Sequence, residues 1–292
     1  MPELPDLDVV ADALHAALTG RAITGVRTLK PLAVRGTPAE LEALVGQRVA
    51  RVARVGKLLD VPLDRDRVVV NPMLTGRLQL AWHGEKAPSG TAVELAFGGR
   101  IGGVPPDAAP WTAGAAWIPP DDATPLVRYR DPSQMGKVYL VPAGSGRVVP
   151  GMADDELGPD ALDPSLTLEA WRARIRRHPG ELKNLLRNQA FVAGIGNAYS
   201  DEILHEARLL PFRKRSSLAA EEVDELYAAM RRTLLASIEL LRSRVPPTFE
   251  QQVRDHLAVH NRGGEPCPRC GTKITLLTAG GFPTGYCRGC QR

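Results

Sequence analysis

Cysteine is scarce in this chain of 292 residues, and all four cysteines lie between positions 267 and 290. The sequence also lacks internal repeats and any apolar run long enough to span a bilayer, which argues against a transmembrane helix. Its acidic N-terminus does not have the pattern of a signal peptide. We therefore expect a soluble, cytoplasmic protein that uses its cysteines locally rather than across the fold.

No charge sign dominates overall, since the formal net charge is only +4. The charge is unevenly distributed, however. Residues 171–292 carry 20 Lys and Arg against 12 Asp and Glu, whereas residues 1–170 carry 17 against 21. A basic C-terminal part favours a polyanionic partner, although a positive face can also serve solubility alone.

The cysteines form two C-x2-C pairs separated by 16 residues, a spacing typical of zinc ribbons. Four thiolates fill a tetrahedral coordination shell, so we expect one structural Zn2+ rather than a catalytic ion. Two disulfides or four unrelated thiols are less favoured alternatives, because nothing in the sequence indicates secretion. The nearby His256 and His260 are expected at the surface. The proposed ligands are Cys267, Cys270, Cys287 and Cys290.

Periodicity divides the remainder into a strand-rich and a helical part. Apolar residues at i+4 spacing from Val10 to Leu18 predict a short amphipathic helix, and short β-branched runs up to residue 141 predict a sandwich or barrel. Residues 102–125, rich in Pro and Gly, predict a long mobile insertion. Helical patterns then cover 166–178, 180–188, 199–207, 219–244 and 249–259. The expected segments are a catalytic domain at 1–142, a linker at 143–160, a helical domain at 161–262 and the cysteine-rich end at 263–292.

A Gly194-Ile195-Gly196-Asn197 turn joins two of the predicted helices. Glycines allow a backbone to approach a phosphate closely, and the N-terminus of the following helix offers free N–H groups to an anion. On these four residues alone, an ordinary helix–helix turn is the preferred interpretation.

Together with motifs elsewhere, this turn resembles the helix–two-turns–helix element of the formamidopyrimidine-DNA glycosylase/endonuclease VIII family. The resemblance covers nearly the full length of the chain. It implies an α+β multidomain protein: an N-terminal β-sandwich with a flanking helix, a helix–two-turns–helix domain and a C-terminal zinc β-hairpin. The other similar motifs are Pro2-Glu3-Leu4-Pro5, Arg54–Leu59, Leu74–Leu78, Asp131–Tyr139, Leu157-Gly158-Pro159 and Gly264–Gln291.

The resemblance implies a bifunctional DNA glycosylase and abasic-site lyase. Removal of Met1 leaves Pro2 as an N-terminal amine, and α-amino groups are less basic than lysine. Its attack on C1′ gives an iminium ion that promotes β/δ-elimination. Glu3 corresponds to the general acid on the sugar, and Lys57 to a phosphate-binding lysine. We expect damaged double-stranded DNA as the partner of a monomeric, nucleoid-associated enzyme.

Several positions depart from the family's lesion-recognition pattern. The hole-filling methionine corresponds to Leu74, the arginine that contacts the orphaned base to Gln134, and the wedge phenylalanine to Met135. Gln134 cannot make a bidentate arginine contact, so we expect weak discrimination for 8-oxoguanine opposite cytosine. Oxidised pyrimidines, ring-opened purines, hydantoins and bare abasic sites are the favoured substrates.

The DNA-binding positions of the C-terminal part differ as well. Lys183 and Asn197 match phosphate contacts, but the zinc-hairpin arginine corresponds to Phe282. Residues 241–249 are shorter than the family loop that covers oxidised purines. A non-catalytic binder of damaged DNA therefore remains an alternative, as does an RNA-binding module, which would explain the cysteine-rich end only.

Overall fold

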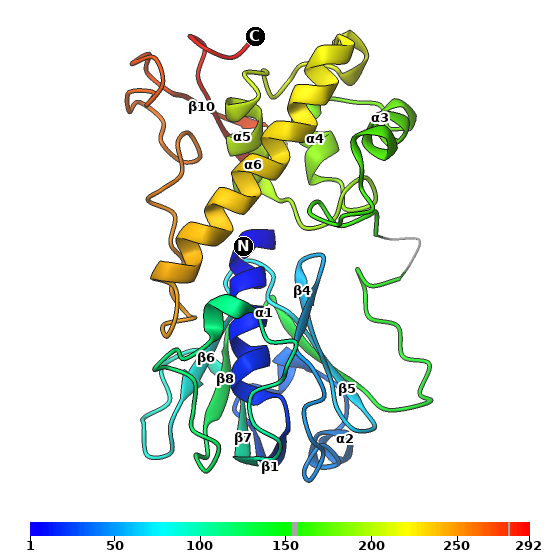
Figure 1. The fold of residues 1–292 in the computed structure, drawn as a ribbon, viewed down its shortest axis with the longest axis vertical. Coiled ribbons are helices and arrows are strands. Elements are labelled where there is room, and N and C mark those ends of the chain that lie inside the picture. The colour runs from blue at the N-terminus through cyan, green and yellow to red at the C-terminus, as the bar shows by residue number, and fades with distance from the viewer. Residues whose placement is uncertain (154–156, 280) are drawn as a thin grey trace. The chain divides into compact units, whose positions relative to one another are not determined.

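In a computed structural model, which describes residues 1–153, 157–279 and 281–292, the chain divides into two compact units (Figure 1). The first, here called the sandwich unit, contains Met1–Pro150 and Leu240–Val253. The second, the helical unit, contains Gly151–Glu239 and Arg254–Arg292. The sequence had suggested four successive segments. In the structure, residues 240–253 group with the strands, and the cysteine-rich end groups with the helices.

The sandwich unit contains two β-sheets with an apolar core between them. Ile23 and Val127 of one sheet and Leu59 and Val68 of the other are buried in this core. Neighbouring strands are antiparallel apart from the short β2–β9 pair. The expected β-sandwich is thus confirmed. Its sheets are β1 (Arg21–Thr28), β7 (Thr91–Arg100), β8 (Leu126–Arg130), β6 (Arg77–Ala81), and β2 (Val34–Arg35), β9 (Lys137–Val141), β5 (Arg67–Asn71), β4 (Leu58–Pro62), β3 (Ala53–Val55).

Helix α1 (Leu4–Leu18) opens the chain and packs against β3 and β4. It begins after Glu3, whose backbone N–H is bonded to the Asp6 carboxylate, and it ends before Gly20, which has a φ of 82°. Almost all of its side chains are buried, so the helix is not amphipathic as its sequence pattern suggested. Its small alanines allow close packing on all sides.

The insertion at residues 102–125, expected to be mobile, folds back onto α1. Trp111, in the short helix η2 (Pro110–Thr112), donates its indole N–H to Asp12 of α1 at 2.7 Å. The C-terminal end of the insertion contacts Arg21 of β1. The guanidinium group of Arg21 is fully buried and donates hydrogen bonds to main-chain carbonyl groups. These contacts could not be predicted from the sequence, because most of them join residues about 100 positions apart. The carbonyl partners of Arg21 are those of Ala17, Gly98, Pro119, Pro120 and Ala123.

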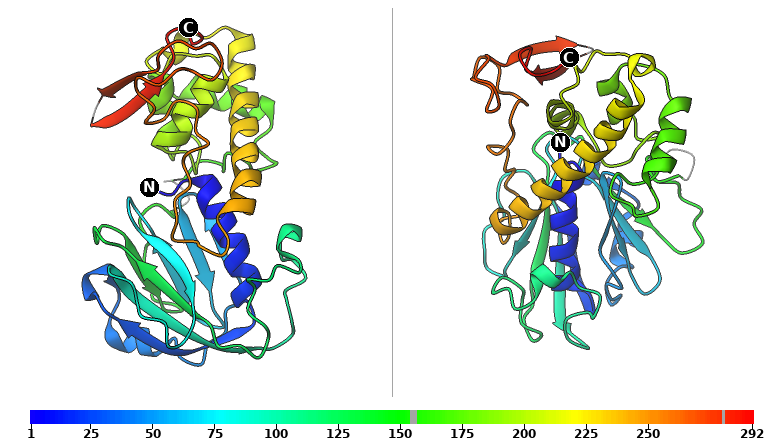
Figure 2. Two further views of the ribbon diagram at one scale, coloured as in Figure 1. Left: turned by 90° about the vertical axis from the view of Figure 1, so that its left-hand side faces the viewer. Right: turned by 45° about the horizontal axis from the view of Figure 1, so that its top comes forward.

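The helical unit is built around Trp171, whose ring lies 5.0 Å from that of Phe191. Its α5 packs against α4 and against the second strand of a C-terminal hairpin (Figure 2). No helix among the described residues is long and apolar enough to cross a membrane. The elements of the helical unit are α3 (Leu168–Arg177), α4 (Leu182–Arg187), α5 (Asn197–Glu206), η3 (Arg215–Ser217), α6 (Ala220–Arg244, which continues into the sandwich unit), β10 (Thr275–Ala279) and β11 (Phe282–Tyr286). The sandwich unit also contains η1 (Pro31–Ala33) and α2 (Pro38–Glu42).

Residues 249–259 are irregular, although their pattern had suggested a helix. The buried Glu202 carboxylate accepts the backbone N–H groups of Ala258, Val259 and His260 at 2.7–2.9 Å. The Glu202 side chain, more than fifty positions away in sequence, thus accepts backbone N–H groups that would bond to backbone carbonyls if this segment were helical.

Candidate functional site

Pro2 and Glu3 are both buried at the start of α1 in the sandwich unit. Asp6 Oδ2 accepts the Glu3 backbone N–H at 2.8 Å, and the two residues form a capping box. This arrangement fixes the backbone of the first turn and so restricts where Pro2 lies. Asp6 thus places a short carboxylate directly at the proposed active-site turn.

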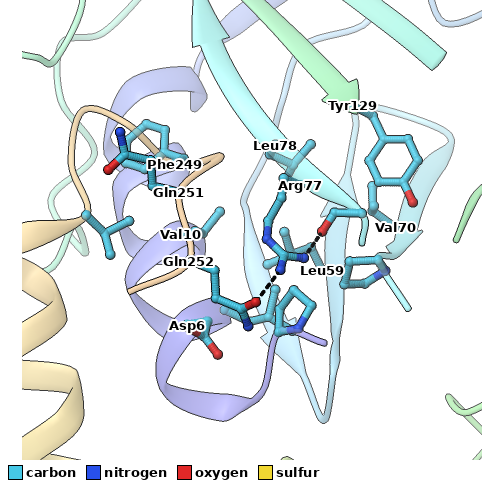
Figure 3. Close-up of a pocket in the computed structure, with 15 residues that line it drawn as sticks. Asp6, Val10, Leu59, Val70, Arg77, Leu78, Tyr129, Phe249, Gln251 and Gln252 are labelled. Carbon is cyan, nitrogen blue, oxygen red and sulfur yellow. Dashed lines mark hydrogen bonds between the residues drawn. The ribbon is translucent and has the colours of Figure 1, made fainter. Parts of the chain in front are cut away.

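Pro2 lines a small cavity whose other walls come from α1, β4–β6, β8 and the segment 245–252 (Figure 3). Arg77 donates to Gln252 Oε1 at 2.7 Å, and Gln252 Nε2 donates to the carbonyl oxygen of Met1 at 3.3 Å. The cavity volume of about 30 Å³ suffices for water. A nucleobase requires a much larger pocket, so this cavity as it stands does not hold one.

Lys57 lies in the tight turn between β3 and β4, half-buried. Gly56 has a φ of 56° in this turn, a conformation that favours glycine, and its carbonyl oxygen accepts from Arg54 at 3.1 Å. Both strands pack on α1, and Leu59 of β4 lines the cavity beside Pro2. The hairpin that presents Lys57 is therefore part of the same local structure as the Pro2 turn.

Asp131 joins the two loops that carry the proposed hole-filling residues. Its carboxylate is fully buried and accepts from the hydroxyl groups of Thr75 and Ser133 and from the backbone N–H of Gly136, the last at 2.7 Å. Burial alone would raise the pKa of Asp131, but these hydrogen bonds outweigh it and lower the pKa below its ordinary value. The sequence motif contained Asp131, but its role as the link between the loops was not foreseen.

Leu74, Gln134 and Met135 project from these linked loops. Leu74 is 47% exposed and Met135 46% exposed, and Gln134 is also exposed with a φ of 55°. The loops are adjacent because β5 and β9 pair up to Asn71 and Lys137. The structure thus brings together the three residues proposed for filling the hole, and two are large apolar side chains exposed to solvent.

Lys183 and Asn197 lie in the helical unit and both contact the C-terminal hairpin. Lys183 is only 4% exposed, and its Nζ donates to Thr284 Oγ1 at 2.8 Å and to the Pro283 carbonyl at 2.9 Å. The same Nζ forms an ion pair with Asp201 Oδ1 at 2.7 Å. Asn197 Nδ2 donates to the same carbonyl at 2.9 Å. In this structure, both side chains hold strand β11 against α4 and α5.

Asp201 is a buried residue that the sequence interpretation missed. Besides Lys183, its carboxylate accepts from His260 Nδ1 at 2.8 Å and from the Gly285 backbone N–H at 3.1 Å. His260 is therefore largely buried rather than a surface residue, since only 11% of its side chain is exposed. An acidic residue one turn after Asn197 was the available signal.

Phe282 begins β11 and is 43% exposed. The guanidinium carbon of Arg187, the last residue of α4, lies 3.7 Å from the centre of its ring. This distance corresponds to a cation–π contact. The position that lacks the family's arginine thus has an arginine from another element stacked upon it.

The four cysteine sulfurs lie within 4.8 Å of one another, in a geometry that can hold a metal ion. The Cys267–Cys290 and Cys270–Cys287 sulfurs are 3.8 and 3.4 Å apart. These separations exceed the roughly 2.05 Å of a disulfide and are close to the roughly 3.8 Å expected between thiolates 2.3 Å from a tetrahedral ion. Hydrogen bonds from Thr272 lower the pKa of Cys270 to about 6, which favours its thiolate, whereas burial raises the pKa values of Cys287 and Cys290.

His205 of α5 contacts this cysteine cluster from the helical core. Its Nε2 lies 3.3 Å from the sulfur of Cys267 and 3.6 Å from that of Cys290. Burial lowers the pKa of His205 to about 4, so the ring is neutral at pH 7 and its Nε2–H can donate to sulfur. Sequence spacing offered no signal for this residue.

Comparison with known proteins agrees with this geometry. The protein-family model for the formamidopyrimidine-DNA glycosylase N-terminal domain matches residues 1–106 of this chain. The family model for the formamidopyrimidine-DNA glycosylase H2TH domain matches residues 157–246. Proteins named formamidopyrimidine-DNA glycosylase from Pelotomaculum thermopropionicum and Geobacillus kaustophilus are 31% and 32% identical over 100% of this chain, and 99% and 100% of theirs.

Solved structures share the fold. The Lactococcus lactis Fpg bound to DNA with an abasic site matches with a TM-score of 0.81 at 23% identity, over 99% of both chains. A complex of the LlFpg protein with THF-DNA and an inhibitor matches with a TM-score of 0.82 at 23% identity, over 100% of both chains.

The sandwich, the H2TH domain and the four-cysteine hairpin together define a DNA glycosylase of base excision repair. With full-length relatives above 30% identity, the chain belongs to the formamidopyrimidine-DNA glycosylase family. The resemblance drawn from its motifs is confirmed, and so is its class as a DNA glycosylase with the abasic-site lyase activity typical of this family.

Proposed function

We propose that Pro2, Glu3 and Lys57 carry out the glycosylase and lyase chemistry on damaged double-stranded DNA. The observation that supports this most directly is the N-terminal turn: Pro2 and Glu3 are buried, fixed by Asp6, and next to the hairpin that presents Lys57. Fixed geometry is what a nucleophile requires for attack at one carbon atom.

In the proposed reaction, the Pro2 nitrogen attacks C1′ of the damaged nucleotide, and the bond from C1′ to the base breaks. The electron pair leaves with the base, which takes up the proton that the Pro2 nitrogen loses on forming its bond to C1′. Glu3 donates a proton to the ring oxygen, the sugar opens, and an iminium ion forms between Pro2 and C1′. A proton is then lost from C2′, the electrons of that bond pass to the iminium, and the bond from C3′ to the 3′ phosphate breaks. Loss of a further proton from C4′ breaks the bond from C5′ to the 5′ phosphate in the same way. Lys57 binds a neighbouring phosphate and stabilises the charge that develops there.

This reaction requires a free Pro2 amine, so Met1 must be removed. Removal also takes away the Met1 carbonyl that accepts from Gln252. The segment 245–252 then loses one of its contacts at the Pro2 cavity. Processing of the N-terminus would thus provide the nucleophile and loosen the segment that closes the cavity.

Leu74, Gln134 and Met135 are proposed to fill the space left by the extruded nucleotide. Their exposure on loops held together by Asp131 supports this role. Because Gln134 offers no bidentate guanidinium contact, we expect oxidised pyrimidines, ring-opened purines and abasic sites to be preferred. Strong excision of 8-oxoguanine restricted to pairs with cytosine would contradict this preference.

The cysteine cluster is proposed to bind one structural Zn2+. Four sulfur donors with near-tetrahedral separations suit zinc and leave no position for substrate. Zinc would fold the hairpin that carries Phe282, while Lys183 and Asn197 would set the hairpin against the H2TH helices. All three residues are proposed to serve DNA binding by a monomer.

Borohydride trapping on a duplex with an abasic site tests the catalytic proposal. The processed protein should give a covalent adduct, whereas Pro2→Gly and an N-terminally extended form should give little. Binding to a non-reactive abasic analogue, measured in parallel, shows that each variant is folded. If no adduct forms although mass spectrometry confirms a free Pro2, the chain is a non-catalytic binder of damaged DNA.

A further inference from the structure

Strand β11 of the C-terminal hairpin lies along helix α4 through two successive contacts. Lys183 bonds to Pro283 and Thr284, and one helical turn later Arg187 stacks on Phe282. Residues at i and i+4 lie on the same face of a helix. The two basic side chains of this face therefore meet neighbouring residues of the same strand.

The two basic residues differ in how their charge is used. Lys183 is 4% exposed, and its ammonium group is surrounded by three protein acceptors, including the buried Asp201 carboxylate. Arg187 is only half-buried and lies against a ring that is itself 43% exposed. Arg187 is therefore the more exposed of the two basic side chains on this face.

Stacking suits a guanidinium group to anion binding. The cation–π contact with Phe282 uses the flat face of the group, whereas its five N–H donors lie in the plane of the group and point outward from its edge. A planar edge of N–H donors matches two phosphate oxygens. The exposed ring restricts the rotation of a flexible side chain and so reduces the entropy lost on binding.

We infer that Arg187, held on the Phe282 ring, binds a phosphodiester group of the DNA backbone. The aromatic residue of the hairpin and the cation of α4 together form one anion-binding unit, which supplies the charge that Phe282 itself lacks. This inference rests on the proposed DNA-binding role of the helical unit. It does not depend on the chemistry assigned to Pro2.

Fluorescence anisotropy with a duplex containing a tetrahydrofuran abasic analogue tests the inference between 50 and 200 mM salt. For Arg187→Gln we expect Kd to rise about tenfold at the lower salt concentration. The slope of log K against log salt should become shallower by about 0.9, as for one lost phosphate contact. Arg187→Lys should restore the slope but only part of the affinity, because an ammonium group stacks and bonds less well.

Arg177→Gln is the matched control, because Arg177 is an exposed arginine at the end of α3 and its loss removes the same charge from the same unit. Its salt slope should stay unchanged. Phe282→Leu should weaken binding without any change in net charge, whereas Phe282→Tyr should preserve it. In a double-mutant cycle, Arg187→Gln and Phe282→Leu should be strongly non-additive.

The inference is overturned if Arg187→Gln affects affinity and slope no more than Arg177→Gln, or if its effect simply adds to that of Phe282→Leu. Circular dichroism and thermal melting of each variant separate loss of folding from loss of contact, and Arg187→Lys offers a second, conservative comparison. Borohydride trapping by the unaltered protein is measured alongside. Its failure would contradict the catalytic proposal while leaving the binding comparison valid.

Discussion

Replacement of Asp131 by Asn should loosen the two loops that carry Leu74, Gln134 and Met135. The substitution keeps the size of the side chain but exchanges one carboxylate oxygen for an NH2 group. In the structure, one oxygen accepts from Thr75 and Ser133, and the other accepts only from the Gly136 backbone N–H. The amide oxygen can replace the carboxylate oxygen that accepts from Thr75 and Ser133. The Gly136 N–H then faces the amide NH2 group, which is also a donor and cannot accept its hydrogen bond.

The expected loss of stability follows from the number of buried donors left without an acceptor. A buried N–H without an acceptor costs about 1–3 kcal/mol, so we expect about 2 kcal/mol for Asp131→Asn. Asp131→Ala removes both oxygens and should cost about 4 kcal/mol on the same basis. The backbone at Gly136 is closely packed, since a Cβ there would clash with Tyr129 Oη.

Amide hydrogen exchange measured by mass spectrometry is the appropriate assay, because it reports local opening in a protein of two units. Peptides covering residues 71–77 and 131–137 should exchange about 30-fold faster in Asp131→Asn. The matched control is Asp64→Asn, an exposed turn residue of the same unit whose carboxylate accepts one backbone N–H. Equal exchange in the two variants would refute the role assigned to Asp131.

The effect should depend on pH in one direction. Because the folded pKa of Asp131 is lower than its unfolded value, its contribution is complete above the unfolded pKa of about 3.9. It is lost as the pH falls through the folded pKa. The difference between the unaltered protein and Asp131→Asn should therefore be largest near neutral pH and shrink below about pH 4.

Three further predictions concern the other contacts. Lys183→Met leaves the buried Asp201 without its cation and should destabilise the helical unit by about 3 kcal/mol in thermal melts, with a smaller loss in Lys183→Met/Asp201→Leu; equal losses would contradict this. A chelator should release one Zn2+ per chain, seen by a metal-sensitive dye, and lower the melting temperature of the helical unit, whereas Cys287→Ser should already lack the ion; an unchanged melting curve would count against a structural ion. Gln252→Ala removes the acceptor of Arg77, so hydrogen exchange in residues 245–253 should accelerate while residues 58–71 stay protected; unchanged exchange there would show that Gln252 does not hold the segment.

The parts of this fold that could be predicted from sequence depend on local patterns. The structure agrees with the strands predicted before residue 142, with most of the predicted helices and with the cysteine spacing. Each of these features is recognised from residues that lie close together in the sequence. The proposed active-site turn could be predicted because Pro2 and Glu3 belong to a contiguous motif. The two loops with the proposed hole-filling residues could be predicted too, although the contacts of Asp131 that link them could not.

The features that escaped prediction depend on partners distant in sequence. The insertion at 102–125 looked mobile because its stabilising contacts come from Arg21 and α1. Lys183 meets Thr284 and His205 meets Cys267 across 101 and 62 positions, respectively. The cation over Phe282 likewise comes from α4, so the substitution of an aromatic residue suggested a lost contact when considered alone.

The most direct test of the account is to locate the covalent bond in the borohydride-trapped complex. After nuclease and protease digestion, tandem mass spectrometry should find the deoxyribose remnant on the nitrogen of Pro2, in an N-terminal peptide that lacks Met1. A remnant on Lys57 or on another lysine, or an adduct formed while Met1 is still attached, would contradict the assignment of Pro2 as the nucleophile.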